Sequence, residues 1–261
     1  MRGIVSFDGV SVAYGRVGVL HEVSFTVGAG EWMGVLGPNG AGKSTLLRTL
    51  VGGPITKGTV SVDGNDMALL RGKAQSLLIA YVPQRPVFPF GMAVFDYVLL
   101  GRTPHLGMLA AERREDIGIV WEALRSLDLE GFAERDMASL SGGETQRVAM
   151  ARVIAQQAPV LVLDEATAAL DVARQHQVLE LIDAVRRDRG IAVISAMHDL
   201  TAAAQFCERV ALLDHGALRG VGSPDEVLTE PLLRDIFEPT VRVIEVEGSR
   251  VIVSMRDKER R

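Results

Sequence analysis

Apolar residues along the chain fall into patterns that predict strands toward both ends and helices in the middle. Apolar and polar positions alternate around Val12 and again around Phe25, which predicts antiparallel β-structure in the first thirty residues. Short, mostly apolar runs predict further strands, at residues 32–36, 58–64, 78–82, 160–163, 191–197 and 209–213. The run at 160–163 is apolar at every position, which is typical of a central strand in a parallel sheet.

Between about residues 87 and 140 the spacing of apolar residues becomes helical. Residues 94–99 predict a short helix, and residues 117–127 carry an apolar stripe on one helical face. The simplest interpretation of this stripe is core packing, with no binding role for Trp121. Residues 101–107, with two glycines and a proline, predict a loop. The region is therefore predicted to be a helical insertion between β-rich halves. Near the end, residues 240–255 predict a hairpin, and residues 256–261 predict a solvated tail.

The composition narrows the class of protein. With 261 residues, the chain can form one large domain or one domain with an insertion. Its formal net charge of -5 gives no general attraction to nucleic acid or to anionic lipid. The single cysteine, Cys207, excludes an internal disulfide and a cysteine-built zinc site. No signal peptide is visible, and no apolar stretch reaches the roughly 18 residues that suggest a membrane span. Another chain is expected to provide any membrane crossing.

A glycine-rich segment links the apolar run at 32–36 to a helix through Leu46 and Leu47. Glycines let successive backbone N–H groups turn toward a phosphate, and the start of a helix adds unpaired N–H groups. Lys43 can reach the terminal phosphates, and the Ser44 hydroxyl can bind Mg²⁺. The alternative is an ordinary turn, but strand, loop and helix in this order predict a nucleoside triphosphate site. Its residues are Gly37, Pro38, Asn39, Gly40, Ala41, Gly42, Lys43, Ser44 and Thr45.

Two carboxylates, Asp164 and Glu165, end the run at 160–163. Side-chain alternation points them in different directions, so they can have different functions. Asp164 is placed to hold Mg²⁺ through water, and Glu165 to orient and polarise the attacking water. The alternative is an acidic pair that stabilises a loop, but the phosphate loop earlier in the chain favours catalysis. His198 ends the run at 191–197 and either reaches the terminal phosphate or lies on the surface.

Three further features each have two interpretations. Residues 141–144, Ser-Gly-Gly-Glu, have the form of a capping box, and their glycines at a helix start also suit a second phosphate contact. Gln84 follows the run at 78–82 and either contacts Mg²⁺ or a water, or is an exposed turn residue. Tyr14 either stacks on a nucleotide base or packs against the protein, and its spacing alone favours packing.

Taken together, these motifs resemble the ATP-binding subunits of ABC transporters. In family order they are the phosphate loop, Gln84, the Leu140–Glu144 signature, Asp164 with Glu165, Asp171 and His198. The resemblance extends from Tyr14 to about Leu233. It implies an α/β fold: a P-loop ATPase core with an antiparallel β-subdomain and an inserted helical subdomain. The expected ATPase domain covers residues 1–240, with the insertion at about 87–157, and residues 241–261 form the hairpin and tail.

The resemblance also implies roles for single residues, with ATP and Mg²⁺ as the bound groups. Tyr14 becomes an adenine-stacking residue, and Gln84 senses Mg²⁺ and the permease. Glu165 becomes the catalytic base and His198 the switch histidine. Lys43 is also assigned to catalysis, Ser44, Gln84 and Asp164 to the metal, and Ser141, Gly142, Gly143 and Asp171 to nucleotide binding. The family commonly has glutamine where this chain has Glu144, so this chain offers a carboxylate there in place of an amide.

Because the chain carries one copy of each motif, the resemblance implies a homodimer. ATP would lie between the phosphate loop of one subunit and Ser141 of the other. A separate integral-membrane permease would contact the Gln84 loop and the helical insertion on the cytoplasmic face of the membrane, and an extracytoplasmic substrate-binding protein would act indirectly. Residues 99–105 resemble importers of metal chelates such as ferric siderophores, haem and vitamin B12. The alternatives are an exporter subunit and an ABC ATPase acting on nucleic acid; the latter usually carries a long coiled-coil insertion, which this sequence lacks.

Overall fold

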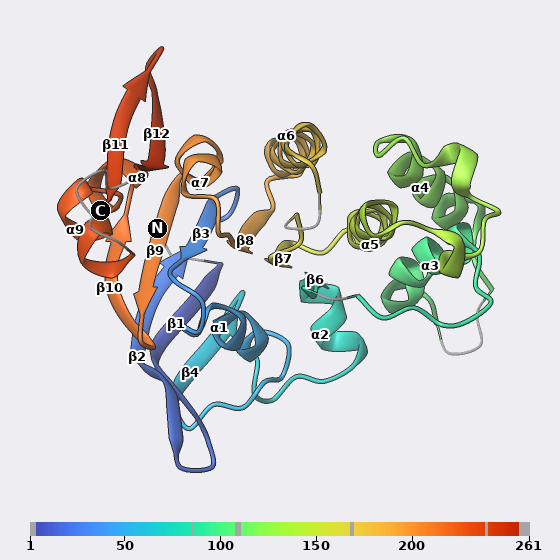
Figure 1. Cartoon of the computed structure of the whole chain (residues 1–261). Helices are drawn as coiled ribbons and strands as arrows, with labels where there is room; N and C mark the ends of the chain where they lie inside the picture. Colours follow the sequence, from blue (N-terminus) through green and yellow to red (C-terminus); the bar gives the residue numbers. More distant parts are fainter. Residues whose placement is uncertain (1–3, 85, 108–110, 168–169, 238–239, 256–261) are drawn as a thin grey trace. The chain divides into compact units, whose positions relative to one another are not determined.

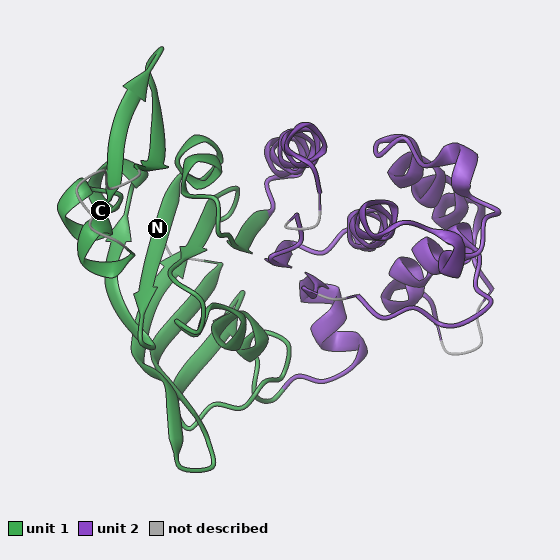
Figure 2. Ribbon diagram, in the orientation of Figure 1, with its two compact units in different colours: residues 1–69, 192–261 green, residues 70–191 purple. Residues whose placement is uncertain are grey.

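The computed structural model describes residues 4–84, 86–107, 111–167, 170–237 and 240–255 (Figure 1). The chain divides into two units, which are coloured separately in Figure 2. Unit 1 contains residues 1–69 and 192–261, and unit 2 contains residues 70–191. The tail predicted at 256–261 lies outside the described residues, and the predicted boundary at residue 240 stays a prediction. No helix in the described part combines the length and the apolarity that crossing a membrane requires.

Unit 1 begins with the antiparallel β-structure that the alternation predicts. Strands β1 (Val5–Tyr14), β2 (Val17–Val27), β4 (Lys57–Val62) and β5 (Asn65–Asp66) form a sheet in the order β2-β1-β4-β5. The inward-facing residues of this sheet make its core: the rings of Phe7 and Phe25, for example, lie 4.6 Å apart and are buried. The predicted antiparallel sheet is therefore confirmed.

The second sheet of unit 1 carries the residues that matter for function. Strand β3 (Trp32–Leu36) pairs in parallel with β8 (Ala192–Ala196) on one side and with β9 (Arg209–Asp214) on the other. Every residue of β3 and β8 is buried, which explains why their runs are apolar at every position except Ser195. The indole of Trp32 donates to the Ser195 hydroxyl at 2.8 Å, so its one polar group is satisfied inside the sheet. Helix α1 (Lys43–Thr49) follows β3.

The last part of unit 1 contains elements that the apolar pattern does not predict. Strand β10 (Ala217–Gly222) pairs with β9, and two short helices follow, α8 (Pro224–Val227) and α9 (Glu230–Ile236). The hairpin predicted at 240–255 is confirmed as β11 (Val241–Val246) and β12 (Ser249–Ser254). Helix α7 (Leu200–Phe206) packs along β12.

Unit 2 contains a parallel strand pair, β6 (Ile79–Val82) and β7 (Val160–Asp164). All of β7 is buried, as predicted for a central strand. The strand predicted at 78–82 begins one residue later, because Leu78 ends an unpredicted helix, α2 (Lys73–Leu78). None of the residues of α2 is buried, so the sequence carries no apolar stripe there. Helix α6 (Val172–Arg189) lies between β7 and the end of the unit.

The rest of unit 2 is the predicted helical region. It contains α3 (Val94–Leu99), α4 (Arg114–Arg125) and α5 (Gly142–Gln156), together with the short 3₁₀ helices η1 (Leu100–His105), η2 (Glu130–Phe132) and η3 (Met137–Ser139). The loop predicted at 101–107 is wrong over most of its length, because η1 occupies it. The buried Arg102 side chain holds η1 in place by bonding the Asp116 carboxylate at 2.9 Å and the Ala155 carbonyl at 2.8 Å.

The apolar stripe at 117–127 is only partly core. Val120 and Leu124 are buried, whereas Ile117 is 39% exposed and Trp121 is 37% exposed. The ring of Trp121 lies 5.1 Å from that of Phe95, so the indole is covered in part by this contact. The prediction that the whole stripe packs in the core is wrong for these two residues, because the stripe is wider than the surface that covers it.

Candidate functional site

The predicted phosphate loop joins β3 to α1 in unit 1. Its backbone has positive φ at Gly37 (144°), Gly40 (81°) and Gly42 (102°), a conformation that side chains rarely adopt. A Cβ atom on Gly37 would lie 2.2 Å from the carbonyl oxygen of Leu213, and one on Gly42 would lie 2.6 Å from Leu20 Cδ2. These positions require glycine for two reasons, the backbone angle and the close neighbours.

Lys43 is the charged group at this loop. Its side chain is buried, and the ammonium donates to the carbonyl of Gly37 at 2.9 Å and to that of Pro38 at 3.2 Å. The positive charge of Lys43 thus lies against the backbone of the loop. It is next to the start of α1, where the unpaired backbone N–H groups favour binding of an anion. Ser44 and Thr45 are half-buried in the first turn of α1, and Asn39 and Gly40 are exposed.

His198 and the phosphate loop share a cavity of about 510 Å³ in unit 1. His198 follows β8 by two residues and is exposed, and the next residue, Asp199, begins α7 by accepting from the Ala202 N–H at 3.0 Å. Pro38 lies on the wall of the cavity, as do residues of the C-terminal hairpin, among them Ile252. The structure therefore brings His198 and Pro38 together, and it adds the hairpin, which the sequence analysis does not connect with this site.

Tyr14 is the last residue of β1 and is 48% exposed. Nearly half of the side chain faces solvent, and the choice between packing and stacking stays a prediction. An exposed ring at a strand end remains available for stacking.

Asp164 and Glu165 lie in unit 2, at the end of β7, in different environments. Asp164 is fully buried, and the hydroxyl of Tyr81 donates to its Oδ2 at 3.0 Å. The sequence analysis does not identify Tyr81 as part of the site. The signal was present, because a phenol within an apolar strand needs a hydrogen-bond partner.

Glu165 has a positive φ of 53°, so the chain turns directly after β7. It is half-buried and accepts from the side-chain amide of Gln84 at 2.5 Å. The structure thus brings together two residues that lie 81 positions apart and were predicted separately. Gln84 itself is exposed.

The capping box predicted at 141–144 is confirmed at the start of α5. The Ser141 hydroxyl accepts from the Glu144 N–H at 3.4 Å, and the Glu144 carboxylate accepts from the Ser141 N–H at 2.7 Å and from its hydroxyl at 2.8 Å. These bonds from Ser141, together with the nearby Arg135 guanidinium, hold the pKa of the Glu144 carboxyl below its ordinary value. Glu144 is therefore a charged acceptor that engages the Ser141 hydroxyl.

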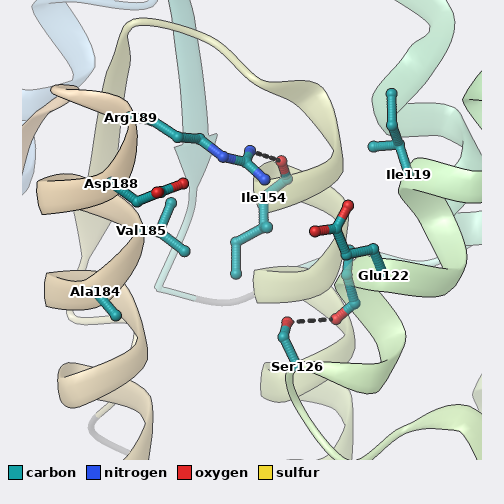
Figure 3. Close-up of a pocket in the computed structure, with 9 residues that line it drawn as sticks. Ile119, Glu122, Ser126, Ile154, Ala184, Val185, Asp188 and Arg189 are labelled. Carbon is teal, nitrogen blue, oxygen red and sulfur yellow. Dashed lines mark hydrogen bonds between the residues drawn. The ribbon is translucent and has the colours of Figure 1, made fainter.

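Asp171 begins α6, where its carboxylate accepts from the Arg174 N–H at 2.9 Å. The residue before it, Leu170, lies close to the signature segment, since a Cβ on Gly143 would lie 3.5 Å from Leu170 Cδ2. A separate cavity of about 210 Å³ lies between α4, α5 and α6 (Figure 3). Its walls include Glu122, Asp188 and Arg189, and the predicted site residues do not line it.

The comparison with protein families matches this arrangement of motifs. The model for the family described as ABC transporter matches residues 20–168, which include the phosphate loop, the signature segment and both carboxylates. This chain belongs to the ABC transporter family. The predicted fold, the nucleotide-binding domain of an ABC ATPase, is thereby confirmed.

Two curated ABC relatives are similar over most of this chain. An ATP-binding protein for hemin import from Streptomyces coelicolor is 42% identical over 241 residues, covering 92% of this chain and 85% of the relative. An ATP-binding protein for cobalamin import from Halobacterium salinarum is 41% identical over 237 residues, covering 90% of this chain. This chain spans 59% of the length of that relative.

Solved ABC structures are similar as well. An inward-facing metal-chelate type ABC transporter has a TM-score of 0.83 and 28% identity, covering 97% of this chain and 98% of the other. A dimeric ATP-binding cassette in a post-hydrolysis state with ADP and Pi has a TM-score of 0.76 and 27% identity, covering 84% and 98%.

Proposed function

We propose that this chain binds and hydrolyses ATP as the ATP-binding subunit of an importer for a metal chelate of the ferric siderophore, hemin or cobalamin type. The observation that carries the proposal is the similarity to hemin and cobalamin import proteins over nine tenths of this chain, with every nucleotide motif present. The 0.83 TM-score to a metal-chelate type transporter supports the same class. The chain would act at the cytoplasmic face of the membrane.

In this proposal the loop at 37–45 holds the phosphates, with Lys43 as its positive charge, and Tyr14 stacks on adenine. Glu165 is the general base, because it directly follows a buried strand, keeps partial access to solvent and is oriented by the Gln84 amide. His198 contacts the terminal phosphate from the cavity that it shares with Pro38. The measurement is phosphate release by the purified chain, which Lys43→Ala should abolish.

Mg²⁺ fits the donor set that the motifs provide. In the described part of the chain, no group of three or more histidine, cysteine, aspartate or glutamate side chains could hold a metal ion. Mg²⁺ bound with nucleotides takes one or two protein oxygens and completes its shell with phosphate oxygens and water. The Ser44 hydroxyl and the Asp164 carboxylate would be such donors, with the Gln84 side chain as a further one. The ion would supply charge neutralisation for the phosphates.

A homodimer would complete the site, because this chain has one signature segment. The dimeric cassette with ADP and Pi supports this assembly. Ser141, Gly142, Gly143 and Asp171 would then meet the nucleotide held by a second copy. Cysteines placed at Ser141 and Asn39, in a Cys207→Ser background, should crosslink between subunits when ATP is present. Crosslinks within single chains only would refute this arrangement.

The permease contact is proposed at the Gln84 loop and the helical region of unit 2. Two large apolar side chains in this loop are almost fully exposed, Val87 at 88% and Phe90 at 98%. Exposed apolar side chains of this size favour a protein partner. An extracytoplasmic binding protein would deliver the chelate to that permease and would not contact this chain.

The cellular test is uptake of radiolabelled ferric siderophore, hemin and cobalamin by cells that lack this chain. Complementation with the wild type should restore uptake of one of them, and complementation with Lys43→Ala should not. If deletion leaves all three unchanged but blocks efflux of a lipid or drug, the importer assignment is wrong and an exporter takes its place.

A further inference from the structure

The C-terminal hairpin is bonded directly to the helix that follows His198. Thr201 lies in the first turn of α7, three residues after His198. Its hydroxyl donates to the carbonyl of Ile252 at 3.2 Å and accepts from the N–H of the same residue at 3.0 Å. One side chain therefore satisfies both backbone groups of one residue in β12.

These backbone groups lie at an edge of the hairpin. Strands β11 and β12 form a sheet of their own, with Ile252 opposite Val243. In a strand, the N–H and C=O of one residue point to the same side, and at a sheet edge they need a partner from elsewhere. Thr201 supplies that partner. The bond pair therefore fixes α7 against β12 at one defined register.

The position of α7 also constrains His198. The residue before it, Met197, donates its N–H to the carbonyl of Val35 at 3.2 Å, which ties this end of the connection to β3. The residue after it, Asp199, is the N-cap of α7. His198 is thus the link between a fixed sheet and a helix, and it lines the same cavity as Ile252. A shift of α7 would move His198 within that cavity.

Helix α7 is short and is held at both ends. It has seven residues, and Ala202 and Ala203 are its buried members. At its C-terminal end the ring of Phe206 lies 5.8 Å from that of Trp32 in β3. A helix of this length is not stable by itself, and two alanine side chains bury little apolar surface. The hydrogen bonds of Thr201 therefore help to decide where the first turn of α7, next to His198, lies.

We propose that Thr201 is a positioning residue for ATP hydrolysis, which holds His198 at the terminal phosphate by docking α7 onto β12. This inference rests on the function proposed above. In this inference the C-terminal hairpin is the surface against which α7 docks, and this docking sets the position of His198. Thr201 itself touches no reacting group.

The test compares Thr201→Val, which keeps the shape of the side chain and removes the hydroxyl, with Thr201→Ser, which keeps the hydroxyl. Thr201→Val should lower kcat about three- to tenfold, the effect expected of one to two ordinary hydrogen bonds. KM for ATP should be unchanged, because the phosphate loop is untouched. Thr201→Ser should restore most of kcat.

The matched control is Thr56→Val, because the Thr56 hydroxyl also donates to a backbone carbonyl, that of Ser11 at 2.8 Å, in the other sheet of unit 1. It should leave kcat unchanged. In a His198→Ala background, Thr201→Val should cause no further loss, since the group that it positions is gone. A general destabilisation would lower the rate in both backgrounds.

Thermal unfolding is followed for each variant. Thr201→Ala serves as a second variant, which removes the hydroxyl without placing the additional methyl group of valine next to Ile252. The inference is overturned if Thr201→Val and Thr201→Ala keep the wild-type kcat, if Thr201→Ser falls equally, or if the loss persists in the His198→Ala background. A wild-type chain with no ATPase activity would instead overturn the proposed function.

Discussion

Replacing Glu165 by glutamine separates catalysis from binding and from stability. The general base contributes about 10²- to 10⁴-fold to a proton transfer, which corresponds to about 3 to 5 kcal/mol of activation free energy. Glu165→Gln should therefore slow hydrolysis by that factor. ATP binding should persist because Lys43, Ser44 and Asp164 are unchanged. ATP-bound dimers should accumulate as a result.

The structure limits the side effects of this substitution. The side-chain oxygen of glutamine can still accept from the Gln84 amide, and the backbone φ of 53° is unaltered. The free energy of unfolding should change by about 1 kcal/mol or less, the difference between a charged and a neutral acceptor. The matched control is Glu22→Gln, an exposed glutamate with φ of 50°, which should hydrolyse ATP as the wild type does.

The assay is single-turnover phosphate release with excess enzyme, with size-exclusion chromatography in ATP and Mg²⁺ as the second measurement. Wild-type turnover in the purified Glu165→Gln chain would refute the assignment of Glu165 as the base. Loss of ATP binding would show that the Glu165 carboxylate contributes to binding of the substrate, and this result would also refute its assignment as the general base.

Three other predictions follow from particular contacts. Gly37→Ala should lower the free energy of unfolding by about 3 kcal/mol and Gly40→Ala by about 1 kcal/mol in urea unfolding, because both strain the backbone but only Gly37 has a backbone oxygen 2.2 Å from the new Cβ. Asp116→Asn should lower stability by about 3 kcal/mol at pH 7, since it leaves the buried Arg102 without its counter-charge. The hydrogen bond from Arg102 lowers the pKa of Asp116, so the stability that the ionised carboxylate gives the wild type is lost as pH falls below about 4. The difference in free energy of unfolding between the wild type and Asp116→Asn should therefore shrink across that pH range. Phe90→Glu should reduce chelate uptake more than basal ATPase activity, because its side chain is 98% exposed; equal loss of both would contradict the permease contact.

The elements that the sequence predicts correctly are those whose burial follows a simple period. The runs at 32–36 and 160–163 are apolar because β3 and β7 are buried on both faces. The capping box at 141–144 is equally local, since its bonds join residues three apart. The apolar pattern does not predict α2, because that helix buries none of its residues. It does not predict α8, because a helix of four residues is too short to show a helical period.

Contacts between distant residues carry the part of the site that the sequence could not reveal. Tyr81 meets Asp164 across 83 positions, and Thr201 meets Ile252 across 51. A pattern of apolar and polar residues states which face of an element is covered, but not which residue covers it. The same limit explains Trp121, whose helical face was predicted correctly but whose cover is incomplete.

The environments of the two adjacent carboxylates support their division of roles without reference to any family. Asp164 is the last residue of a buried strand, has no exposed surface and is oriented by a phenol, so its carboxylate is held in one orientation, which suits a cation ligand. Glu165 directly follows this strand, retains contact with solvent and accepts from the side-chain amide of the exposed Gln84. A general base that takes a proton from water needs that access to solvent. A residue that is regulated by a protein partner needs a hydrogen bond that the partner can shift. Because Gln84 lies next to the exposed loop that carries Phe90, we expect a protein bound to that loop to act first on the hydrogen bond between Gln84 and Glu165.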